Sequence, residues 1–365
     1  MEILFFKLSE SFDLIAFFTF TSSFILALFL VPKVRWIVKN RGLIDHPDIR
    51  SSHKDSTPTM AGIAFFLIIL FISSIIKPWD DQAISINLLS ALGLIFAIGI
   101  KDDLMVSTAK AKLGAQLLAI LFILFCYCIQ FTTFNGFLGI YDVPVFLSYF
   151  LVVLMFLTII NSFNLIDGID GLASCIGIVI FAIYAYLFIE FNLHYFALLS
   201  FSLIGILMGY LRYNLSKKGK IFMGDTGSLI IGFCIALFSL KFLTIDVETL
   251  NESSFNGENS IIIVGAIFFI PLLDTLRIIG VRLINNKNPF DSDNNHIHHI
   301  LIKLGFSHIK SSLILSLTNL SIAVSTILLS RHLNSFKLLA VMIIYYLFFV
   351  TIFYILKRKY KVKVN

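Results

Sequence analysis

The sequence predicts an all-α, polytopic integral membrane protein. Of its 365 residues, 58% are hydrophobic and only 14% are charged, and the mean hydropathy is +0.93. A soluble domain is about 45–50% apolar and about 25% charged. Apolar runs near the length that crosses a bilayer, about 20 residues, recur along the whole chain. No polar stretch is long enough to fold separately, so we expect one integral domain over 1–365.

About eleven apolar segments are expected to be transmembrane helices. They cover 12–32, 60–77, 84–100, 112–131, 143–160, 171–190, 195–211, 227–243, 260–283, 311–330 and 337–356. The first is expected to be a retained span, because no small-residue cleavage site follows it. The four cysteines lie in apolar segments, so we expect buried thiols and no disulfide.

The basic residues predict how the chain is oriented. With an odd number of spans and a cytoplasmic C-terminus, most of the 28 Lys and Arg residues fall on the cytoplasmic side. The exceptions are Lys7, Lys77, Lys241, Arg331 and Lys337. The positive-inside rule therefore places the N-terminus outside and the C-terminus in the cytoplasm. This topology explains the net charge of +6 without a nucleic-acid partner.

Five polar clusters fall in the segments assigned to the cytoplasm. They lie at 52–62, 101–103, 161–171, 222–228 and 271–277 with 295–299. Carboxylates at the edge of hydrocarbon are costly and usually mark function. We therefore expect the active-site loops to be 33–59, 101–111, 161–171, 212–228 and 284–310.

The third cluster repeats a polar residue every three positions, at Asn161, Asn164, Asp167 and Asp170. On a helix this spacing places the four roughly along one side. Gly168 would let backbone or a ligand approach closely. A polar seam between helices is the structural alternative, but a second Asp-rich loop favours a functional site.

The residue types indicate a chemistry. Asp and Asn oxygens suit Mg²⁺, which proteins usually hold with one or two carboxylates plus substrate phosphates. The run 224–228, Gly-Asp-Thr-Gly-Ser, opens a span and offers N–H groups, a hydroxyl and a carboxylate to a pyrophosphate. The histidines at 296–299 lack further ligands at zinc spacing. The clusters together predict Mg²⁺-dependent phosphoryl-type transfer at the inner membrane surface.

In this order the clusters resemble those of the polyprenyl-phosphate N-acetylhexosamine-1-phosphate transferases of glycosyltransferase family 4. The resemblance spans 53–299 and rests on Asn-x-x-Asn-x-x-Asp-Gly-x-Asp-Gly and Gly-Asp-x-Gly-Ser. It implies transfer of N-acetylhexosamine-1-phosphate from a UDP-sugar to undecaprenyl phosphate, with release of UMP. The product would start an O-antigen, common-antigen, teichoic-acid or capsule-type glycan of the bacterial cell envelope. The resemblance further implies a multi-pass protein of the plasma membrane, surrounded by lipid, and a homodimer.

The resemblance also implies a role for each matching residue. Asp102 and Asp103 match a catalytic pair, and Asn164 and Asp225 match Mg²⁺ ligands, with Mn²⁺ as an alternative metal. The matching substrate-binding positions are Asp167, Asp170, Phe222, His296, His298, His299 and Lys54. Of these, Phe222 corresponds to a ring that stacks near the uracil, and the histidines lie near the nucleotide-sugar phosphates.

The run 289–291, Pro-Phe-Asp, followed by 296–299, His-Ile-His-His, resembles the bacterial branch that uses UDP-GlcNAc or a related sugar. The alternative is the peptidoglycan branch, which uses UDP-MurNAc-pentapeptide. Two residues depart from the family pattern: Ala61 replaces the first Gly of a Gly-Gly pair, and Asn294 replaces a frequent Arg.

Three other classes fit the sequence less well. A transporter should carry its polar residues near the bilayer midplane in repeated halves, whereas these lie at one face. A CDP-alcohol phosphatidyltransferase needs Asp-Gly-x-x-Ala-Arg, but Asp167 and Gly168 are followed by Ile-Asp-Gly-Leu. A non-catalytic scaffold would not need the acidic clusters. For a transferase, two mechanisms remain open: direct attack by the lipid phosphate, and a two-step route through an aspartyl-phosphate.

Overall fold

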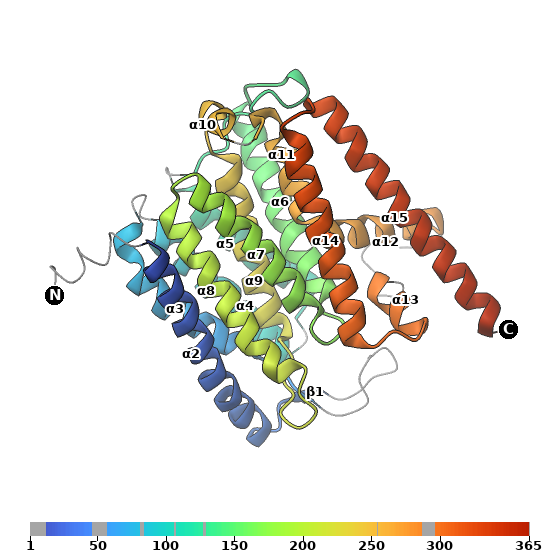
Figure 1. Cartoon of the computed structure of the whole chain (residues 1–365). Helices are drawn as coiled ribbons and strands as arrows, with labels where there is room; N and C mark the ends of the chain where they lie inside the picture. Colours follow the sequence, from blue (N-terminus) through green and yellow to red (C-terminus); the bar gives the residue numbers. More distant parts are fainter. Residues whose placement is uncertain are drawn as a thin grey trace. The chain divides into compact units, whose positions relative to one another are not determined.

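A computed structural model describes residues 12–45, 57–80, 84–105, 107–126, 129–253, 255–286 and 296–364. Across these residues the secondary structure is helical, apart from one two-stranded sheet and an isolated bridge between Thr133 and Asp142 (Figure 1). The all-α class predicted from hydropathy is confirmed. The chain divides into two compact units, whose boundaries fall near residue 130 and within two helices, at 176–177 and 238–239.

Among the described residues, unit 1 comprises those up to 130 together with 177–238. Its helices are α2 (Phe12–Asn40), α3 (Gly62–Ile75), α4 (Ile84–Leu104), α5 (Ala109–Leu124) and α8 (His194–Asn214), with the short turn η1 (Lys77–Trp79). Most of α7 (Leu172–Glu190) and of α9 (Gly224–Leu243) also belongs to it. Strands β1 (Ile44–Asp45) and β2 (Thr57–Pro58) pair antiparallel, with Ile44 opposite Pro58 and Asp45 opposite Thr57.

Among the described residues, unit 2 comprises 131–176 and those from 239 onward. Its helices are α6 (Val145–Ile166), α10 (Val247–Glu252), α11 (Ser260–Ile267), α12 (Phe269–Ile284), α13 (Ile297–Lys303), α14 (His308–Ser330) and α15 (Ser335–Val364). The short turns η2 (Phe137–Gly139) and η3 (Gly257–Asn259) complete it.

Each of the eleven apolar segments contains a helix, but not every helix is long enough to span a bilayer. Among the described residues, eight helices are long and apolar enough to cross a membrane, and a bent pair of helices would make nine. The two remaining segments form α3 with 14 residues and α5 with 16, fewer than the roughly 20 that a straight span needs. The structure therefore supports a multi-pass protein, and eleven spans stay a prediction.

Close backbone contact joins α2 to α8 in unit 1. A side chain at Gly205 would meet the carbonyl oxygen of Phe20 at 2.5 Å, and one at Gly209 would meet the Cβ of Ala27 at 2.6 Å. The hydroxyls of Ser23 and Ser202 lie 2.8 Å apart in the same interface. Small residues four positions apart are a common means of packing helices in lipid, where close approach replaces the hydrophobic effect.

In unit 2 the segment expected to be one span, 260–283, is broken. Helices α11 and α12 meet at Phe268 with a bend of 72°. Buried Asn319 of α14 accepts the N–H of Ile270 at 2.9 Å and donates to the carbonyl of Ile267 at 2.8 Å. Backbone groups freed by a break inside a membrane need protein partners, and one amide side chain supplies two of them.

The expectation of four thiols is wrong for Cys126, which is disulfide-bonded, whereas Cys175 and Cys234 are free. Helix α5 ends at Leu124, two residues before Cys126, so this cysteine lies outside the helix instead of within the expected span 112–131. The end of α5 is the end predicted to face outward, where disulfides persist.

Candidate active site

The expected site residues are divided between the two units. Unit 1 contains Asp102 and Asp103 at the end of α4, Phe222 before α9, and Asp225 in its first turn. Unit 2 contains Asn164, Asp167 and Asp170 around the end of α6, with His296, His298 and His299 at the start of α13. Lys54 lies outside the described residues.

In unit 1, the Asp103 carboxylate caps the N-terminus of α9. It accepts the N–H of Asp225 at 2.8 Å, the N–H of Thr226 at 3.1 Å and the Thr226 hydroxyl at 2.5 Å. The first N–H groups of a helix have no partner within the helix, and the helix dipole favours a negative charge there. Asp103 therefore supplies the acceptors for the first N–H groups of α9 and fixes the position of Asp225 in its first turn.

Its neighbour Asp102 has a different environment. Its carboxylate accepts the N–H of Ser107 at 2.7 Å and pairs with the Lys112 ammonium at 3.0 Å. The same ammonium lies 3.2 Å from Asp225, whose side chain is 32% exposed. One cation thus bridges two carboxylates from α4 and α9. We call Asp102, Asp103, Lys112, Asp225 and Thr226 the carboxylate cluster.

Glycines allow this close assembly. Gly224 adopts a left-handed conformation, with φ of 74°, and a side chain there would meet the Asp103 carboxylate at 2.7 Å. A side chain at Gly99 would meet the Cα of Thr226 at 2.5 Å, and one at Gly62 would overlap the backbone of Gly227. The glycines of the Gly-Asp-Thr-Gly-Ser run and its neighbours thus let α3, α4 and α9 approach at the cluster.

Backbone hydrogen bonds connect Phe222 to the segment that precedes α3. Its N–H donates to Pro58 at 2.8 Å and its carbonyl accepts from Ala61 at 3.2 Å, while Gly62 donates to Met223 at 3.2 Å. The Lys220 ammonium lies 5.1 Å from the centre of the half-buried Phe222 ring. The first and fourth polar clusters of the sequence are therefore joined, and Ala61, which departs from the family pattern, fits there fully buried.

In unit 2, the expected helical row of Asn and Asp residues is not continuous, because α6 ends at Ile166. Asn161 and Asn164 are helical, whereas Asp167 occupies the C-cap and Asp170 lies in the turn that follows. Gly171, with φ of 82°, ends this turn in a conformation that favours glycine. The regular spacing therefore marks a helix end and a turn, and not one face.

His308 and Ser312 of α14 hold Asp170. The Nδ1 atom of His308 lies 3.1 Å from the Asp170 carboxylate and 3.3 Å from its N–H, and the Ser312 hydroxyl donates to its carbonyl at 2.9 Å. No motif in the sequence assigned a function to His308. In the structure His308 supports the turn through its contacts with Asp170. The two residues lie far apart in the sequence, so no local pattern reveals this contact.

The histidines at the start of α13 gather around Asp274 of α12. Asp274 is 2% exposed, pairs with Arg277 at 3.0 Å, and accepts the N–H of Ile297 at 3.0 Å. His296 Nδ1 lies 2.8 Å from the second carboxylate oxygen. The His298 ring stacks on His296 with centroids 5.5 Å apart. We call Asp274, Arg277, His296 and His298 the histidine cluster.

His298 is 2% exposed, and its Nε2 atom is buried without a hydrogen-bond partner among the described residues. A side chain on Gly168 would overlap this nitrogen, so the imidazole packs directly on the turn after α6. Burial lowers the pKa of His298 to about 3, although the charge of Asp274 acts in the opposite direction. His298 is therefore neutral at physiological pH and serves as packing between α13 and the turn.

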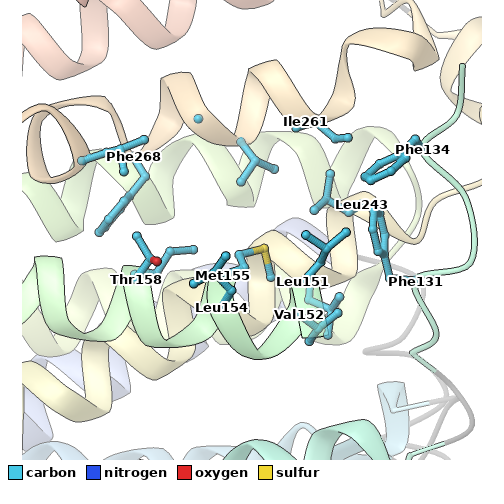
Figure 2. Close-up of a pocket in the computed structure, with 15 residues that line it drawn as sticks. Phe131, Phe134, Leu151, Val152, Leu154, Met155, Thr158, Leu243, Ile261 and Phe268 are labelled. Atoms are coloured by element: carbon cyan, nitrogen blue, oxygen red, sulfur yellow. The ribbon is translucent and has the colours of Figure 1, made fainter. Parts of the chain in front are cut away.

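Unit 2 also contains an apolar pocket of about 340 Å³. Its walls come from α6, α11 and the ends of α9 and α12, with Phe131 and Phe134 at one end (Figure 2). Thr158 is the one lining residue with a polar side chain. Pockets of this size and lining suit an apolar ligand.

Lys112 and Asp274 have clear structural roles that the sequence analysis did not predict. In the sequence analysis Lys112 contributed only to the count of cytoplasmic basic residues. Its position in the first turn of the helix that follows Asp102 and Asp103 could have indicated an ion pair with them. Asp274 belonged to a noted cluster but had no role, although a carboxylate inside an apolar helix usually marks function. Lys112 lies 113 residues from its partner Asp225, and Asp274 lies 22 residues from its partner His296. These pairs are therefore visible only in the folded structure.

The donor set of the carboxylate cluster fits a hard divalent cation. Asp225 offers a half-exposed carboxylate, and its position beside Asp102 already accommodates one cation, the Lys112 ammonium. In unit 2, Asn164 offers an amide oxygen at the half-buried end of α6. Oxygen donors of this kind, completed by phosphates, suit Mg²⁺.

Comparison with known proteins places these residues in a family. The sequence profile of glycosyl transferase family 4 matches residues 85–243. A Bacillus subtilis (strain 168) protein described as a probable undecaprenyl-phosphate N-acetylglucosaminyl 1-phosphate transferase is 32% identical over 85% of this chain and 84% of its own length. The Escherichia coli (strain K12) undecaprenyl-phosphate alpha-N-acetylglucosaminyl 1-phosphate transferase is 29% identical over 97% and 93%. A Yersinia pestis transferase of the same description is 28% identical over 85% and 81%.

Proposed function

Because the chain belongs to glycosyl transferase family 4, we propose that it transfers N-acetylhexosamine-1-phosphate from a UDP-sugar to undecaprenyl phosphate. GlcNAc-1-phosphate is the favoured group, since the relatives are described as N-acetylglucosaminyl 1-phosphate transferases. An oxygen of the lipid phosphate attacks the β-phosphorus, and the bond to UMP breaks, with UMP leaving with the electron pair. The structural observation that supports this most directly is the carboxylate cluster, where a cation already bridges Asp102 and Asp225.

Within the catalytic pair, the geometry favours Asp102 as the base. Three donors at the α9 terminus bind the Asp103 carboxylate. Asp102 accepts one backbone N–H, from Ser107, and pairs with the Lys112 ammonium, which a substrate can displace. The base need only remove the last proton of a phosphate monoester, whose second pKa is about 6. Positioning and charge stabilisation therefore carry most of the catalysis.

Asp225 and Asn164 are the proposed Mg²⁺ ligands, with Mn²⁺ as an alternative. A bound Mg²⁺ would neutralise charge that develops on the diphosphate as UMP departs. The residues of this chain supply the rest: Lys112 balances the charge of Asp102 and Asp225, and Phe222 offers its ring to the uracil. Asp167, Asp170, Lys54, His296 and His299 are the proposed contacts to the donor substrate. His298, which the sequence grouped with them, is buried against Gly168 and is left out.

The apolar pocket of unit 2 is a proposed site for part of the lipid chain. Gly265 lines it, and a Cβ at this position would meet nothing within 4 Å, so a larger side chain there would project into free space. We expect Gly265→Leu to raise the KM for undecaprenyl phosphate more than the KM for a polyprenyl phosphate of a few isoprene units. Gly280→Leu is the matched control, because Gly280 is equally open and lies outside the pocket.

We further propose the eleven-span topology in the bacterial plasma membrane, with the N-terminus outside and the active-site residues and C-terminus in the cytoplasm. The distribution of Lys and Arg supports this. Single cysteines in a cysteine-free background test it: Lys217→Cys should react only after the membrane is permeabilised, and Glu248→Cys should react in intact cells. The opposite pattern would reverse the topology. Both positions are exposed.

The reaction is tested by UMP release from the purified protein in detergent with undecaprenyl phosphate and Mg²⁺. UDP-GlcNAc, UDP-GalNAc and UDP-MurNAc-pentapeptide are offered separately. We expect UMP from UDP-GlcNAc, dependent on both lipid and metal. UMP from the pentapeptide substrate alone would move the chain to the peptidoglycan branch, and no UMP from any of the three would contradict the proposal.

A further inference from the structure

Asp274 lies outside the residues to which the proposed reaction assigns a role, yet it is the centre of the histidine cluster. Three groups bind its carboxylate: the Arg277 guanidinium, the Ile297 N–H and His296 Nδ1. A carboxylate that is 2% exposed within an apolar helix is costly unless it is fully paired. Because the Ile297 N–H opens α13, this one side chain both neutralises Arg277 and fixes where the next helix begins.

The contact to His296 sets which ring nitrogen carries hydrogen. An ionised carboxylate only accepts hydrogen bonds, so Nδ1 of His296 must be the donor. The Nε2 atom has no hydrogen-bond partner among the described residues, and the side chain keeps 10% of its surface exposed. When the ring also carries a proton on Nε2, that N–H points away from Asp274 and can donate to an anion.

Its neighbour His298 is built differently. Its Nε2 atom is completely buried against Gly168, so no substrate atom can reach it. Its neutral ring stacks on His296 and adds no competing charge. The structure thus separates two histidines that the sequence treats alike: His296 presents a nitrogen outward and His298 packs inward.

We propose that Asp274 is a positioning residue that orients His296, so that His296 Nε2 donates to the diphosphate of the UDP-sugar. This rests on the proposed function, since it assigns a group to that donor substrate. Asp274 touches no substrate, and it acts through the ring of His296 and the start of α13. His298 is a packing residue in this arrangement and not a phosphate contact.

The test is a double-variant cycle with Asp274→Asn and His296→Asn. Each single change should raise the KM for UDP-GlcNAc roughly 10-fold, because a charge-assisted hydrogen bond is lost. The KM for undecaprenyl phosphate should stay constant. The double variant should be no worse than the more damaging single, since both changes remove one interaction. His332→Asn, an exposed histidine of unit 2, is the control partner whose effect should multiply with that of Asp274→Asn.

Binding of UDP, measured by calorimetry without lipid acceptor, gives a readout that does not need turnover. Its Kd should rise in both single variants and in the same non-additive manner. If wild type releases no UMP but these UDP affinities couple, the proposed reaction fails and the positioning role of Asp274 stands. If wild type is active and the two effects multiply, or both KM values rise together, the role of Asp274 is refuted.

Asp274→Asn could prevent folding because it leaves Arg277 without a full counter-charge. Asp274→Glu then serves in its place: the charge is kept and the carboxylate is moved by one methylene. It should raise the UDP Kd less than His296→Asn does, and its effect should vanish in the His296→Asn background. An effect of Asp274→Glu that persists without the His296 imidazole would overturn the proposal.

Discussion

Asp103 caps α9 through Thr226, whose N–H and hydroxyl both donate to the same carboxylate oxygen, at 3.1 and 2.5 Å. The two residues are 123 positions apart in the chain. The contact separates Asp103 from its neighbour Asp102, which faces Lys112. Two adjacent aspartates that look equivalent in the sequence therefore have different physical roles.

Asp103→Asn is expected to lower the stability of the protein, whereas Asp102→Asn should mainly lower its activity. Both carboxylate oxygens of Asp103 accept hydrogen bonds, so Asp103→Asn sets an NH2 group against at least one of these donors. Leaving a donor unsatisfied costs about 1–3 kcal/mol, so the melting temperature should fall. Asp102→Asn should leave the melting temperature within about 2 °C of wild type and reduce UMP release at least 100-fold, as for loss of a general base. Thr226→Val, which removes one donor to Asp103, is the matched control for the cap. Equal melting temperatures for the Asp102 and Asp103 variants would contradict the assignment.

Lys112→Gln should change the metal requirement. The ammonium now neutralises Asp102 and Asp225 together, and without it the two carboxylates attract a divalent cation more strongly. We expect the Mg²⁺ concentration for half-maximal UMP release to fall about 3–10-fold, while kcat also falls because Asp102 loses its partner. Lys110→Gln, an exposed lysine in the same turn, should change neither quantity. A higher Mg²⁺ requirement in Lys112→Gln would mean that the lysine assists the metal instead of balancing the site.

Gly168→Ala should disrupt the contact with His298. The added methyl would overlap His298 Nε2, so the buried imidazole would have to shift. Overpacking of this kind costs about 1–3 kcal/mol, so both the melting temperature and UMP release should fall. Adding His298→Ala should recover part of the lost stability. Gly280→Ala, where a methyl meets nothing within 4 Å, should be neutral or slightly stabilising.

Hydropathy was sufficient to place every long helix, because a bilayer requires apolar length and little else. It could not place the break between α11 and α12. Pro271 was a local signal, since proline is tolerated in the first turn of a helix and not in its interior. The partner that stabilises the break, Asn319, lies 49 positions from Ile270 and is not visible in any local pattern.

The residues of the candidate site were predictable from the sequence, but their contacts with distant residues were not. Residue types and spacing indicated Asp, Asn and His around a phosphate-binding chemistry. Whether a given carboxylate caps a helix, pairs with lysine or orients a histidine depends on distant backbone and side chains. The even spacing from Asn161 to Asp170 was misleading, because α6 ends at Ile166. The last two residues of the pattern lie at the C-cap and in the following turn, which Gly171 closes with a positive φ.

Asn319→Leu tests the brace at the break. It would leave the Ile270 N–H and the Ile267 carbonyl without their present partner in a buried position. The expected loss is about 1–3 kcal/mol, because each group would have to be desolvated without a hydrogen bond. Asn319→Gln, which keeps both an acceptor and a donor on a side chain longer by one methylene, should lose less. Ser321→Ala is the control, since its exposed hydroxyl bonds only within α14. Thermal unfolding in detergent measures all three, and an unchanged Asn319→Leu variant would show that the brace is dispensable.

His298 should make the folded protein sensitive to acid. Its pKa is about 3 in the folded state because burial disfavours the imidazolium, against about 6.5 in an unfolded chain. Between these values only the unfolded chain binds the proton, so stability falls as the pH drops below 6.5 and is unaffected above it. At pH 5 the effect amounts to about 2 kcal/mol.

The comparison that isolates this histidine is the drop in melting temperature between pH 7.5 and 5.0 for wild type and His298→Gln. Other titrating groups act in both proteins, so the difference between the two drops belongs to position 298. We expect the smaller drop in His298→Gln, and the same drop as wild type in the control His332→Gln, which changes an exposed histidine. Equal drops in wild type and His298→Gln would mean that the imidazole is hydrated in the folded protein, and the packing of His298 on Gly168 would then be wrong.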